Sequence, residues 1–374
     1  MIRFEQVVKR YADGTVAVDD LSLEAPTGQI TVLVGPSGCG KTTSLRMINR
    51  MIEPTAGRIF IDDQDVTAAN AAKLRRGIGY VIQHAGLFPH RKVVDNVATV
   101  PLLLGQSKAQ ARGRAREVLE LVGLPGDFAD RYPAQLSGGQ QQRVGVARAL
   151  AADPPVMLMD EPFSAVDPVV REQLQDEFLR LQTELGKTIV FVTHDIDEAM
   201  KLGDQVAVMR VGGRLAQIAD PAYLLAHPID DFVADFIGRD RGYRALTFTS
   251  APPLPVVSEP TVVLGATPEQ ARQATTDRWL LVVDAGQKPQ GWVEPARIEA
   301  AIEPAMLHRG GTVAREHGPL RAALDAALSS PSRRGVLVDD DGVLRGTVRA
   351  HEVLQAIEAA DRPDVDPADI APTR

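Results

Sequence analysis

The segment from Gly35 to Thr42, GPSGCGKT, has the residue types and spacing of a loop that binds phosphate groups. Its glycines let backbone N–H groups turn towards phosphate oxygens, and the helical pattern that follows would point the positive end of its dipole at the same anion. Lys41 is expected to reach the β- and γ-phosphates of a nucleotide, and the Thr42 hydroxyl is expected to ligate magnesium. The expected phosphate-binding residues are Gly35, Pro36, Ser37, Gly38, Cys39, Gly40, Lys41, Thr42 and Thr43.

Two adjacent carboxylates, Asp160 and Glu161, follow the apolar run VMLM further along the chain. Side chains at the carboxyl end of a strand in an open α/β sheet lie where ligands bind. Asp160 is expected to hold magnesium through water, and Glu161 is expected to orient or deprotonate a water that attacks a phosphate. A strand that ends in Asp-Glu is more often structural when it stands alone, but beside a phosphate-binding loop the catalytic interpretation is favoured.

The sequence LSGGQ, residues 136–140, is followed by QQRVGVARAL and resembles the signature of the ATP-binding-cassette (ABC) ATPases. The resemblance covers about residues 2–237 and implies ATP and Mg²⁺ as cofactors. In this family the signature meets the nucleotide of a second subunit, because each subunit's own phosphate loop already surrounds the other side of its nucleotide. The resemblance therefore implies a head-to-tail homodimer in which the residues that act on the partner's ATP are Ser137, Gly138, Gly139 and Gln140.

Four further residues match ABC motifs in the order that the family shows. Gln83 at the end of IGYVIQ resembles the Q-loop glutamine, which senses the γ-phosphate through magnesium or the attacking water. Asp167 in SAVD resembles the D-loop aspartate, and His194 in FVTHD resembles the switch histidine that contacts the γ-phosphate. Tyr11 resembles the aromatic residue whose ring stacks on adenine. The resemblance thus implies Glu161, His194 and Gln83 as catalytic residues and Thr42, Gln83 and Asp160 as the metal site.

The candidate site residues must be positioned by the elements around them. Apolar runs alternate there with longer amphipathic stretches, and the four runs are ITVLVG, IGYVIQ, VMLMD and TIVFVTH. Such continuous runs are typical of buried strands in a mostly parallel sheet. Between about residues 84 and 155 the pattern is helical, because five apolar side chains recur on one face: Ala111, Ala115, Val118, Leu119 and Val122. The sequence predicts an α/β ATPase domain over 1–240, with antiparallel β and helical subdomains.

A weak repeat follows, in which the segment from Leu280 aligns with the segment from Gly335 at an offset of 55 residues. Each copy predicts a strand, a turn with acidic residues and glycine, a second strand and a helix. Asp284 then matches Asp339, and Gly291 matches Gly346. We expect a linker over 241–262, a smaller α+β tandem module over 263–360 and a disordered acidic tail over 361–374.

The repeated module resembles a pair of cystathionine-β-synthase-like (CBS) domains. CBS domains that bind adenosine nucleotides use a Ser or Thr and, three residues later, an Asp. The first copy has Glu294 and Arg297 at these two places, and the second copy has Arg349 and Glu352. Only Glu352 keeps a carboxylate that is able to accept the ribose hydroxyls. The replacements disfavour adenine-nucleotide binding and leave ionic-strength sensing, a signalling nucleotide or dimer spacing as open roles.

Composition limits where the chain works. The formal net charge of −8 disfavours nucleic acid as a partner, and a single cysteine requires no oxidising compartment. No apolar run approaches the roughly 18 residues of a membrane span, and the first residues do not form a signal peptide. We expect a peripheral protein at the cytoplasmic face of the plasma membrane. The segment HAGLFPHRKVVDNV resembles the surface on which importer cassettes receive a transmembrane permease subunit.

The segments YPAQLSGGQQQRVGVARAL and DPAYLLAHPIDDFVADFIGRDRGYRAL resemble cassettes that import quaternary amines: glycine betaine, carnitine, choline or proline betaine. The resemblance implies osmoprotectant import, with a substrate-binding protein or domain as an indirect partner. Import of another small solute, or export, stays open. A soluble ABC ATPase that acts on DNA or ribosomes is disfavoured because the chain has one continuous cassette, and a CBS sensor without catalysis is disfavoured by the complete set of hydrolytic residues.

Overall fold

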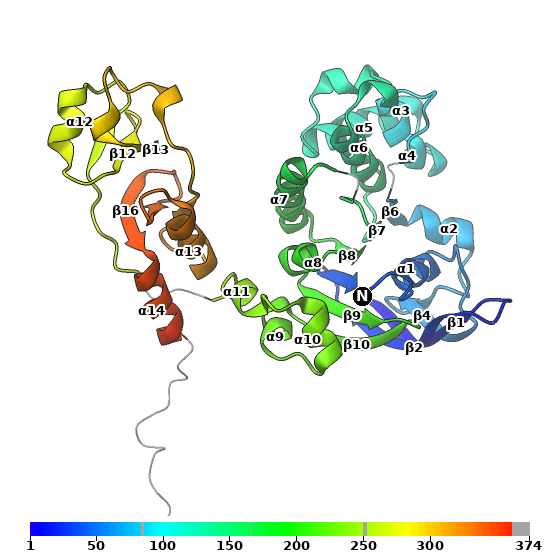
Figure 1. Ribbon diagram of the computed structural model, residues 1–374. Coiled ribbons are helices and arrows are strands. Elements are labelled where there is room, and N and C mark those ends of the chain that lie inside the picture. The colour runs from blue at the N-terminus through cyan, green and yellow to red at the C-terminus, as the bar shows by residue number, and fades with distance from the viewer. Residues whose placement is uncertain (84–85, 165, 250–252, 361–374) are drawn as a thin grey trace, which may run out of the picture. The chain divides into compact units, whose positions relative to one another are not determined.

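The computed structural model describes residues 1–374 apart from 84–85, 165, 250–252 and 361–374, so the predicted acidic tail lies outside the described residues. The chain divides into two compact units, Met1–Gly238 and Arg239–Arg374 (Figure 1). Each unit has its own buried apolar clusters. We describe each unit by itself.

A six-stranded sheet forms the centre of the first unit, in the order β10-β9-β3-β8-β7-β6. Its strands are β3 (Ile30–Val34), β6 (Ile78–Val81), β7 (Val156–Asp160), β8 (Thr188–Val192), β9 (Gln205–Arg210) and β10 (Arg214–Ala219). All neighbouring pairs are parallel except β9 and β10. All residues of β3, β7 and β8 are buried, as continuous apolar runs with helices on both faces require. The four strands predicted from the apolar runs are confirmed.

A second, antiparallel sheet covers one side of the helix that follows the phosphate loop. Its order is β2-β1-β4-β5, and its strands are β1 (Ile2–Arg10), β2 (Val16–Ala25), β4 (Ala56–Ile61) and β5 (Gln64–Asp65). One apolar cluster joins Phe4 of this sheet, Leu45 of helix α1 (Lys41–Ile48) and Leu158 of the parallel sheet. The phosphate-loop helix is therefore held between two sheets, which fixes the direction of its N-terminus.

Helices gather at one end of the first unit, around α3, α5 and α6 (Figure 1). The predicted apolar face of α5 is confirmed, since Ala111, Ala115, Val118 and Leu119 are fully buried. The helices of this region are α3 (Val93–Val97), α4 (Thr99–Leu103), α5 (Lys108–Leu121), η1 (Gly126–Asp130), η2 (Pro133–Gln135) and α6 (Gly138–Leu150). Besides α1, the other helices that the structure describes in this unit are α2 (Ala71–Arg76), α7 (Pro168–Leu185), α8 (Ile196–Leu202), α9 (Pro221–Ala226) and α10 (Asp231–Ile237).

The second unit contains the same three-stranded motif twice. Sheet β11-β12-β13 and sheet β14-β15-β16 each pair their first two strands in parallel and their last two antiparallel. The 55-residue offset holds in detail: Asp284 and Asp339 each cap the following turn, and Gly291 and Gly346 have φ angles of 148° and 150°. The strands are β11 (Thr261–Val263), β12 (Leu280–Val283), β13 (Pro289–Val293), β14 (Val313–Arg315), β15 (Arg334–Val338) and β16 (Leu344–Arg349).

Helix placement differs between the two copies. After β16 the chain forms α14 (Ala350–Ala360), whereas after β13 it forms only the turns η3 (Pro295–Arg297) and η4 (Pro304–Met306). The predicted helix is missing there because the backbone N–H and carbonyl of Ile302 bond residues 266 and 265 in place of helical partners. The remaining helices are α11 (Arg241–Ala245), α12 (Pro268–Ala274) and α13 (Leu320–Ser329).

The range 241–262, expected as a linker, is packed in its described part. Helix α11 begins it, and four of its side chains lie against the buried cluster of α13, β15 and α14: Tyr243, Leu246, Leu254 and Val256. The Tyr243 hydroxyl also donates to the carboxylate of Asp325 on α13. Apolar residues in this proline-rich stretch thus serve the core of the second unit.

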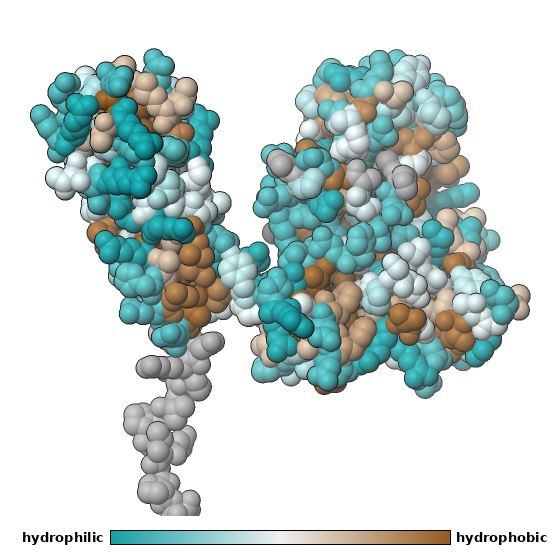
Figure 2. Space-filling view, in the orientation of Figure 1, coloured by the Kyte–Doolittle hydropathy of each residue, from teal (hydrophilic) through white to brown (hydrophobic). Residues whose placement is uncertain are grey.

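Hydrophilic and weakly polar residues cover most of the visible face of both units (Figure 2). Among the helices that the structure describes, none combines the length and the apolar character needed to cross a bilayer.

Candidate active site

Two glycines of the phosphate loop have conformations and surroundings that exclude a side chain. Gly35, which follows β3, has φ 155°, and a Cβ there would lie 2.4 Å from the Met209 carbonyl oxygen. Gly40, the N-cap of α1, has φ 87°, and a Cβ there would lie 2.2 Å from the Ala17 carbonyl oxygen. The loop therefore lies closely packed between β2 and β9.

Lys41 lies inside the loop and is only 7% exposed. Its ammonium group donates to the carbonyl oxygens of Gly35 at 2.7 Å and Pro36 at 3.1 Å, and it lies 3.6 Å from the Cys39 sulfur. These partners are neutral, so a phosphate would offer the same ammonium stronger, charge-assisted hydrogen bonds.

Thr42 and Asp160 meet at the predicted metal site. The Thr42 hydroxyl donates to a carboxylate oxygen of Asp160 at 2.9 Å, and Asp160 is 5% exposed. Burial raises the pKa of the Asp160 carboxyl, and the Thr42 hydroxyl and the Arg46 guanidinium act against that rise. Hydroxyl and carboxylate oxygens are ligands that Mg²⁺ accepts, so these residues fit such an ion. The described residues include no group of three or more His, Cys, Asp and Glu side chains that would hold a metal alone.

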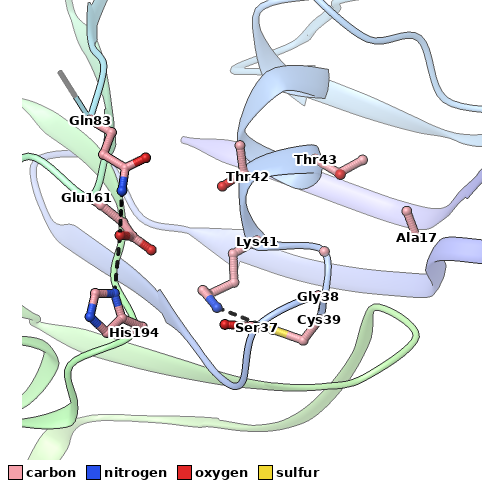
Figure 3. A pocket seen from close by; sticks show the side chains of 11 residues that line it. Ala17, Ser37, Gly38, Cys39, Lys41, Thr42, Thr43, Gln83, Glu161 and His194 are labelled. Atoms are coloured by element: carbon pink, nitrogen blue, oxygen red, sulfur yellow. Dashed lines mark hydrogen bonds and ion pairs between the residues drawn. The ribbon is translucent and has the colours of Figure 1, made fainter. Parts of the chain in front are cut away.

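Glu161 lies between Gln83 and His194 (Figure 3). One of its carboxylate oxygens, Oε2, is 3.1 Å from the Gln83 amide nitrogen and 3.1 Å from Nδ1 of His194. The Glu161 backbone has a left-handed φ of 46°, which is uncommon for a residue with a side chain, and its N–H donates to the carbonyl oxygen of Val192 at the end of β8. Gln83, Glu161 and His194 follow three different strands, and the first and last of them meet at one oxygen of Glu161.

The phosphate loop and these three side chains line one cavity of about 630 Å³. Its lining comprises Ala17, Ser37, Gly38, Cys39, Gly40, Lys41, Thr42, Thr43, Gln83, Glu161 and His194. The Glu161 carboxylate, Lys41 and residues of the phosphate loop thus line one space that is large enough for a nucleotide phosphate chain.

The signature residues lie apart from this cavity, whose described lining contains none of residues 137–140. Ser137 is the N-cap of α6: its hydroxyl accepts from the Gln140 N–H at 3.3 Å, while the Gln140 side chain accepts from the Ser137 N–H at 2.9 Å. This capping box presents the N-terminus of a 13-residue helix at the surface. Asp167, directly before α7, and Tyr11, directly after β1, also lie outside the cavity lining.

Sequence reasoning missed Arg46, whose guanidinium lies 3.8 Å from the buried Asp160 carboxylate. Arg46 is four residues after Thr42 on α1, so the two side chains share a helix face. That spacing is a signal in the sequence that would have placed Arg46 near the metal site.

The site geometry and the fold define a class. The family model described as "ABC transporter" matches residues 18–164. A dimeric ATP-binding cassette solved in a post-hydrolysis state with ADP and Pi is similar to this chain, with a TM-score of 0.55 and 35% identity over 59% of this chain and 99% of that one. The predicted α/β cassette fold and the ATPase class are confirmed.

Curated relatives extend the similarity to most of the chain. The carnitine transport ATP-binding protein OpuCA of Listeria monocytogenes is 47% identical over 80% of this chain and 76% of its own length. The glycine betaine/carnitine/choline transport ATP-binding protein OpuCA of Bacillus subtilis is 46% identical over 96% of both chains. The osmoprotectant import ATP-binding protein OsmV of Salmonella typhimurium is 43% identical over 93% of this chain and 94% of its own length. This chain belongs to the family of ABC transporter ATP-binding proteins.

Proposed function

We propose that this chain hydrolyses ATP to power the import of a quaternary-amine osmoprotectant through a membrane permease. The observation that carries the hydrolytic part is the position of Glu161, which lies with Gln83 and His194 on the cavity that the phosphate loop lines. The family and its relatives support the transport part.

In the proposed reaction, a water attacks the γ-phosphorus of ATP while Glu161 accepts its proton. The new P–O bond forms as the bond to the oxygen bridging the β- and γ-phosphates breaks, which yields ADP and phosphate. Lys41 turns from the Gly35 and Pro36 carbonyls to the phosphate oxygens, and the loop N–H groups stabilise the charge. His194, whose side chain is 60% exposed, is free to turn towards the γ-phosphate.

Thr42, Asp160 and Gln83 are the residues that we propose for Mg²⁺, with Asp160 acting through water. When bound, the ion supplies neutralisation of charge on the phosphate oxygens. The 2.9 Å contact between Thr42 and Asp160 supports this assignment, because the two oxygens already lie together at the start of α1.

The separate location of the signature supports a head-to-tail homodimer. The α6 N-terminus with Ser137, Gly138, Gly139 and Gln140 would complete the γ-phosphate site of the partner chain, while Tyr11 stacks on adenine and Asp167 lies at the seam. The permease would dock on the first unit at the cytoplasmic face of the membrane, and a substrate-binding protein or domain would deliver the cargo.

Glycine betaine, carnitine, choline and proline betaine are the proposed cargoes, with another small solute as the alternative. The relatives named for carnitine, choline and glycine betaine transport support the first group.

For the second unit we propose a tandem CBS module over 263–360 that regulates the cassette. Its two copies of one sheet topology support this assignment.

Glu161→Gln tests the hydrolytic proposal. The variant keeps the shape of the side chain but removes the base, so we expect ATP affinity within about threefold of wild type and phosphate release reduced at least about 100-fold. Size-exclusion chromatography with ATP should show a trapped dimer, because nucleotide stays between the subunits.

The matched control is Glu184→Gln, which changes a surface carboxylate paired with Arg180 on α7. This control should hydrolyse ATP at the wild-type rate. Wild-type phosphate release by Glu161→Gln would refute the assigned base.

Uptake of labelled betaine, carnitine and choline by vesicles with the assembled transporter tests the cargo. Uptake of none of them would refute the quaternary-amine proposal.

A further inference from the structure

Lys9 lies over the ring of Tyr11, with its ammonium nitrogen 5.2 Å from the ring centroid. The two residues are two apart in the chain, at the end of strand β1. Lys9 is the penultimate residue of β1, and Tyr11 directly follows the strand. Tyr11 stays 39% exposed, so the ring is accessible although one face carries a cation.

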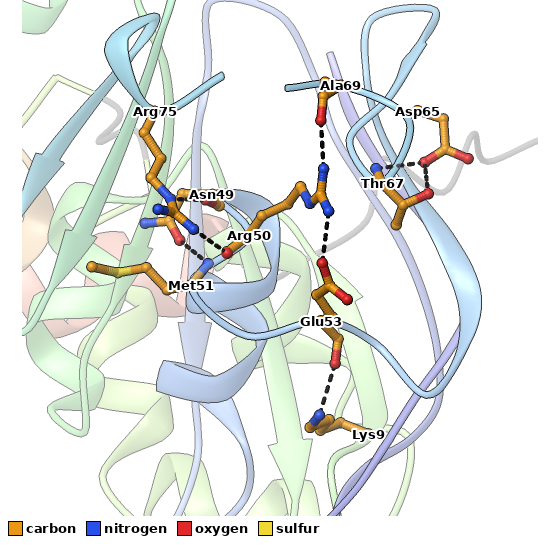
Figure 4. A network of polar contacts seen from close by, with 9 residues as sticks. All are labelled: Lys9, Asn49, Arg50, Met51, Glu53, Asp65, Thr67, Ala69 and Arg75. Atoms are coloured by element: carbon orange, nitrogen blue, oxygen red, sulfur yellow. Dashed lines mark hydrogen bonds and ion pairs between the residues drawn. The ribbon is translucent and has the colours of Figure 1, made fainter. Parts of the chain in front are cut away.

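A polar network fixes the position of the Lys9 ammonium (Figure 4). Lys9 Nζ donates to the Glu53 carbonyl oxygen at 2.8 Å, and the Glu53 carboxylate pairs with Arg50 at 2.6 Å. The Arg50 side chain also donates to the Ala69 carbonyl oxygen. The Arg50 guanidinium holds the pKa of the Glu53 carboxyl below its usual range, and Lys9 adds to that effect.

The network begins two residues after helix α1, and it therefore connects the phosphate-loop helix to Tyr11. Arg75 strengthens this connection by donating to the carbonyl oxygens of Asn49 at 3.1 Å and Arg50 at 2.5 Å. The strand end is fixed as well, because Thr55 bonds the backbone of Arg10 in both directions and the Tyr11 N–H donates to Thr15 at 2.9 Å. The cation and the backbone that carries the ring thus have anchored positions.

We infer that Lys9 is a positioning residue for the nucleotide base: it holds the Tyr11 ring from one face so that adenine stacks on the other. The inference rests on the proposed role of Tyr11. An ammonium against an aromatic face is attracted by the ring quadrupole, and fixing the ring beforehand lowers the entropy lost when a base binds. The triphosphate is bound by other residues, so Lys9 acts on the base alone.

Lys9→Met tests this, because methionine keeps an unbranched stem and loses the cation. The change should lower affinity for ATP by about two- to fivefold, the range of an exposed cation–π contact, and leave affinity for inorganic tripolyphosphate unchanged. Calorimetric titration of the full chain in the Glu161→Gln background avoids consumption of ATP. Lys9→Arg should restore ATP affinity, since a guanidinium also lies well against a ring.

The matched control is Arg3→Met. Arg3 also lies on β1 over an aromatic ring, with its guanidinium carbon 5.0 Å from the Phe60 centroid, and its loss should leave ATP affinity unchanged. Tyr11→Ala should lower ATP affinity without changing tripolyphosphate affinity, and Lys9→Met should have no further effect in that background.

Equal loss of both ligands in Lys9→Met, or a further loss in the Tyr11→Ala background, would overturn the positioning role. If Tyr11→Ala weakens ATP and Lys9→Met does not, the inference fails while the proposed function of Tyr11 stands. If Tyr11→Ala leaves ATP affinity unchanged, the stacking role itself fails, and the inference fails with it.

Discussion

At the scale of single residues, the ammonium group of Lys41 is held by the loop that it serves. Carbonyl oxygens of Gly35 and Pro36 accept its hydrogen bonds while its side chain is buried. The cation and the curved loop therefore hold each other in place before any nucleotide arrives, with the Cys39 sulfur nearby at 3.6 Å. In the proposed function, a triphosphate would exchange these carbonyl partners for its own anionic oxygens.

Lys41→Ala should therefore weaken nucleotide binding itself. Loss of charge-assisted hydrogen bonds worth about 1.5–3 kcal/mol predicts roughly 10- to 150-fold lower ATP affinity, measurable by fluorescence titration. Lys187→Ala is the control, because Lys187 pairs with Asp153 at 2.6 Å and does not line the cavity, so this variant should bind ATP normally. Unchanged ATP affinity in Lys41→Ala would exclude the phosphate-binding role.

The sequence predicted the phosphate loop and the convergence of Gln83, Glu161 and His194, because motif order and the carboxyl ends of parallel strands place such residues together. It did not predict Lys9 or the inward turn of Lys41. Those positions depend on contacts with Glu53 and with the loop's own carbonyls, which no periodic pattern encodes.

At the scale of elements, two helices of the first unit begin with the same capping box. Ser137 caps α6 and Ser107 caps α5, and in each the serine hydroxyl accepts from a backbone N–H at 3.3 Å. Ser137 belongs to the proposed dimer interface and Ser107 does not. Comparing the two serines therefore separates the effect of a cap on stability from its effect on binding.

Ser137→Ala and Ser107→Ala should each lower the free energy of unfolding by about 1 kcal/mol, as loss of an N-cap does. Only Ser137→Ala should also weaken ATP-induced dimerisation, measured by light scattering in the Glu161→Gln background. Equal dimerisation in the two variants would argue against a contact between Ser137 and the partner's nucleotide.

Glu198, in the first turn of α8, gives a pH-dependent element. Burial raises the pKa of its carboxyl, although hydrogen bonds from Thr193 and Gln175 act in the opposite direction. The fold thus favours the protonated form of the carboxyl. The resulting contribution to stability is complete below pH 4.5, the ordinary pKa of a glutamate carboxyl, and it is lost as the pH rises through the higher pKa of the folded state.

Glu198→Gln should therefore raise the melting temperature at about pH 7.5, because it removes an ionised buried carboxylate and keeps an oxygen for the Gln175 amide, which donates at 3.1 Å. The advantage should disappear below pH 4.5, which thermal scans across pH will show. A constant difference at every pH would mean that titration of Glu198 is unimportant.

Element prediction was accurate where burial has a clear period, as in β3 and α5, and inaccurate where backbone pairing overrides the pattern. Ile302 is apolar at helical spacing from Ile298, yet its backbone bonds residues 265 and 266 in place of helical partners. The prolines of 241–262 suggested a linker. The sequence did not show that Tyr243 and Leu246 pack against the apolar core of the second unit.

At the scale of the whole molecule, the two units have separate apolar cores. Damage to the second core should therefore leave the nucleotide site intact. Gly346 offers a test, because its φ is 150° and a Cβ there would lie 2.5 Å from the Val257 carbonyl oxygen.

Gly346→Ala should destabilise the second unit by more than about 2 kcal/mol and separate its unfolding from that of the first unit, with ATP affinity unchanged. Differential scanning calorimetry with and without ATP measures both effects. Gly310→Ala, where a Cβ meets nothing within 4 Å, should behave as wild type. Loss of ATP binding in Gly346→Ala would show that the units fold as one.

Gln83 and His194 both lie beside one carboxylate oxygen of Glu161, and this geometry has a consequence for the rate of the proposed ATP hydrolysis. The Gln83 amide donates to Oε2, and Nδ1 of His194 lies 3.1 Å from the same oxygen, so in the proposed reaction a water at Oε2 would compete with both groups. If His194 turns towards the γ-phosphate as proposed, one of these two positions becomes available to the water, so the geometry would keep ATP hydrolysis slow until that turn occurs.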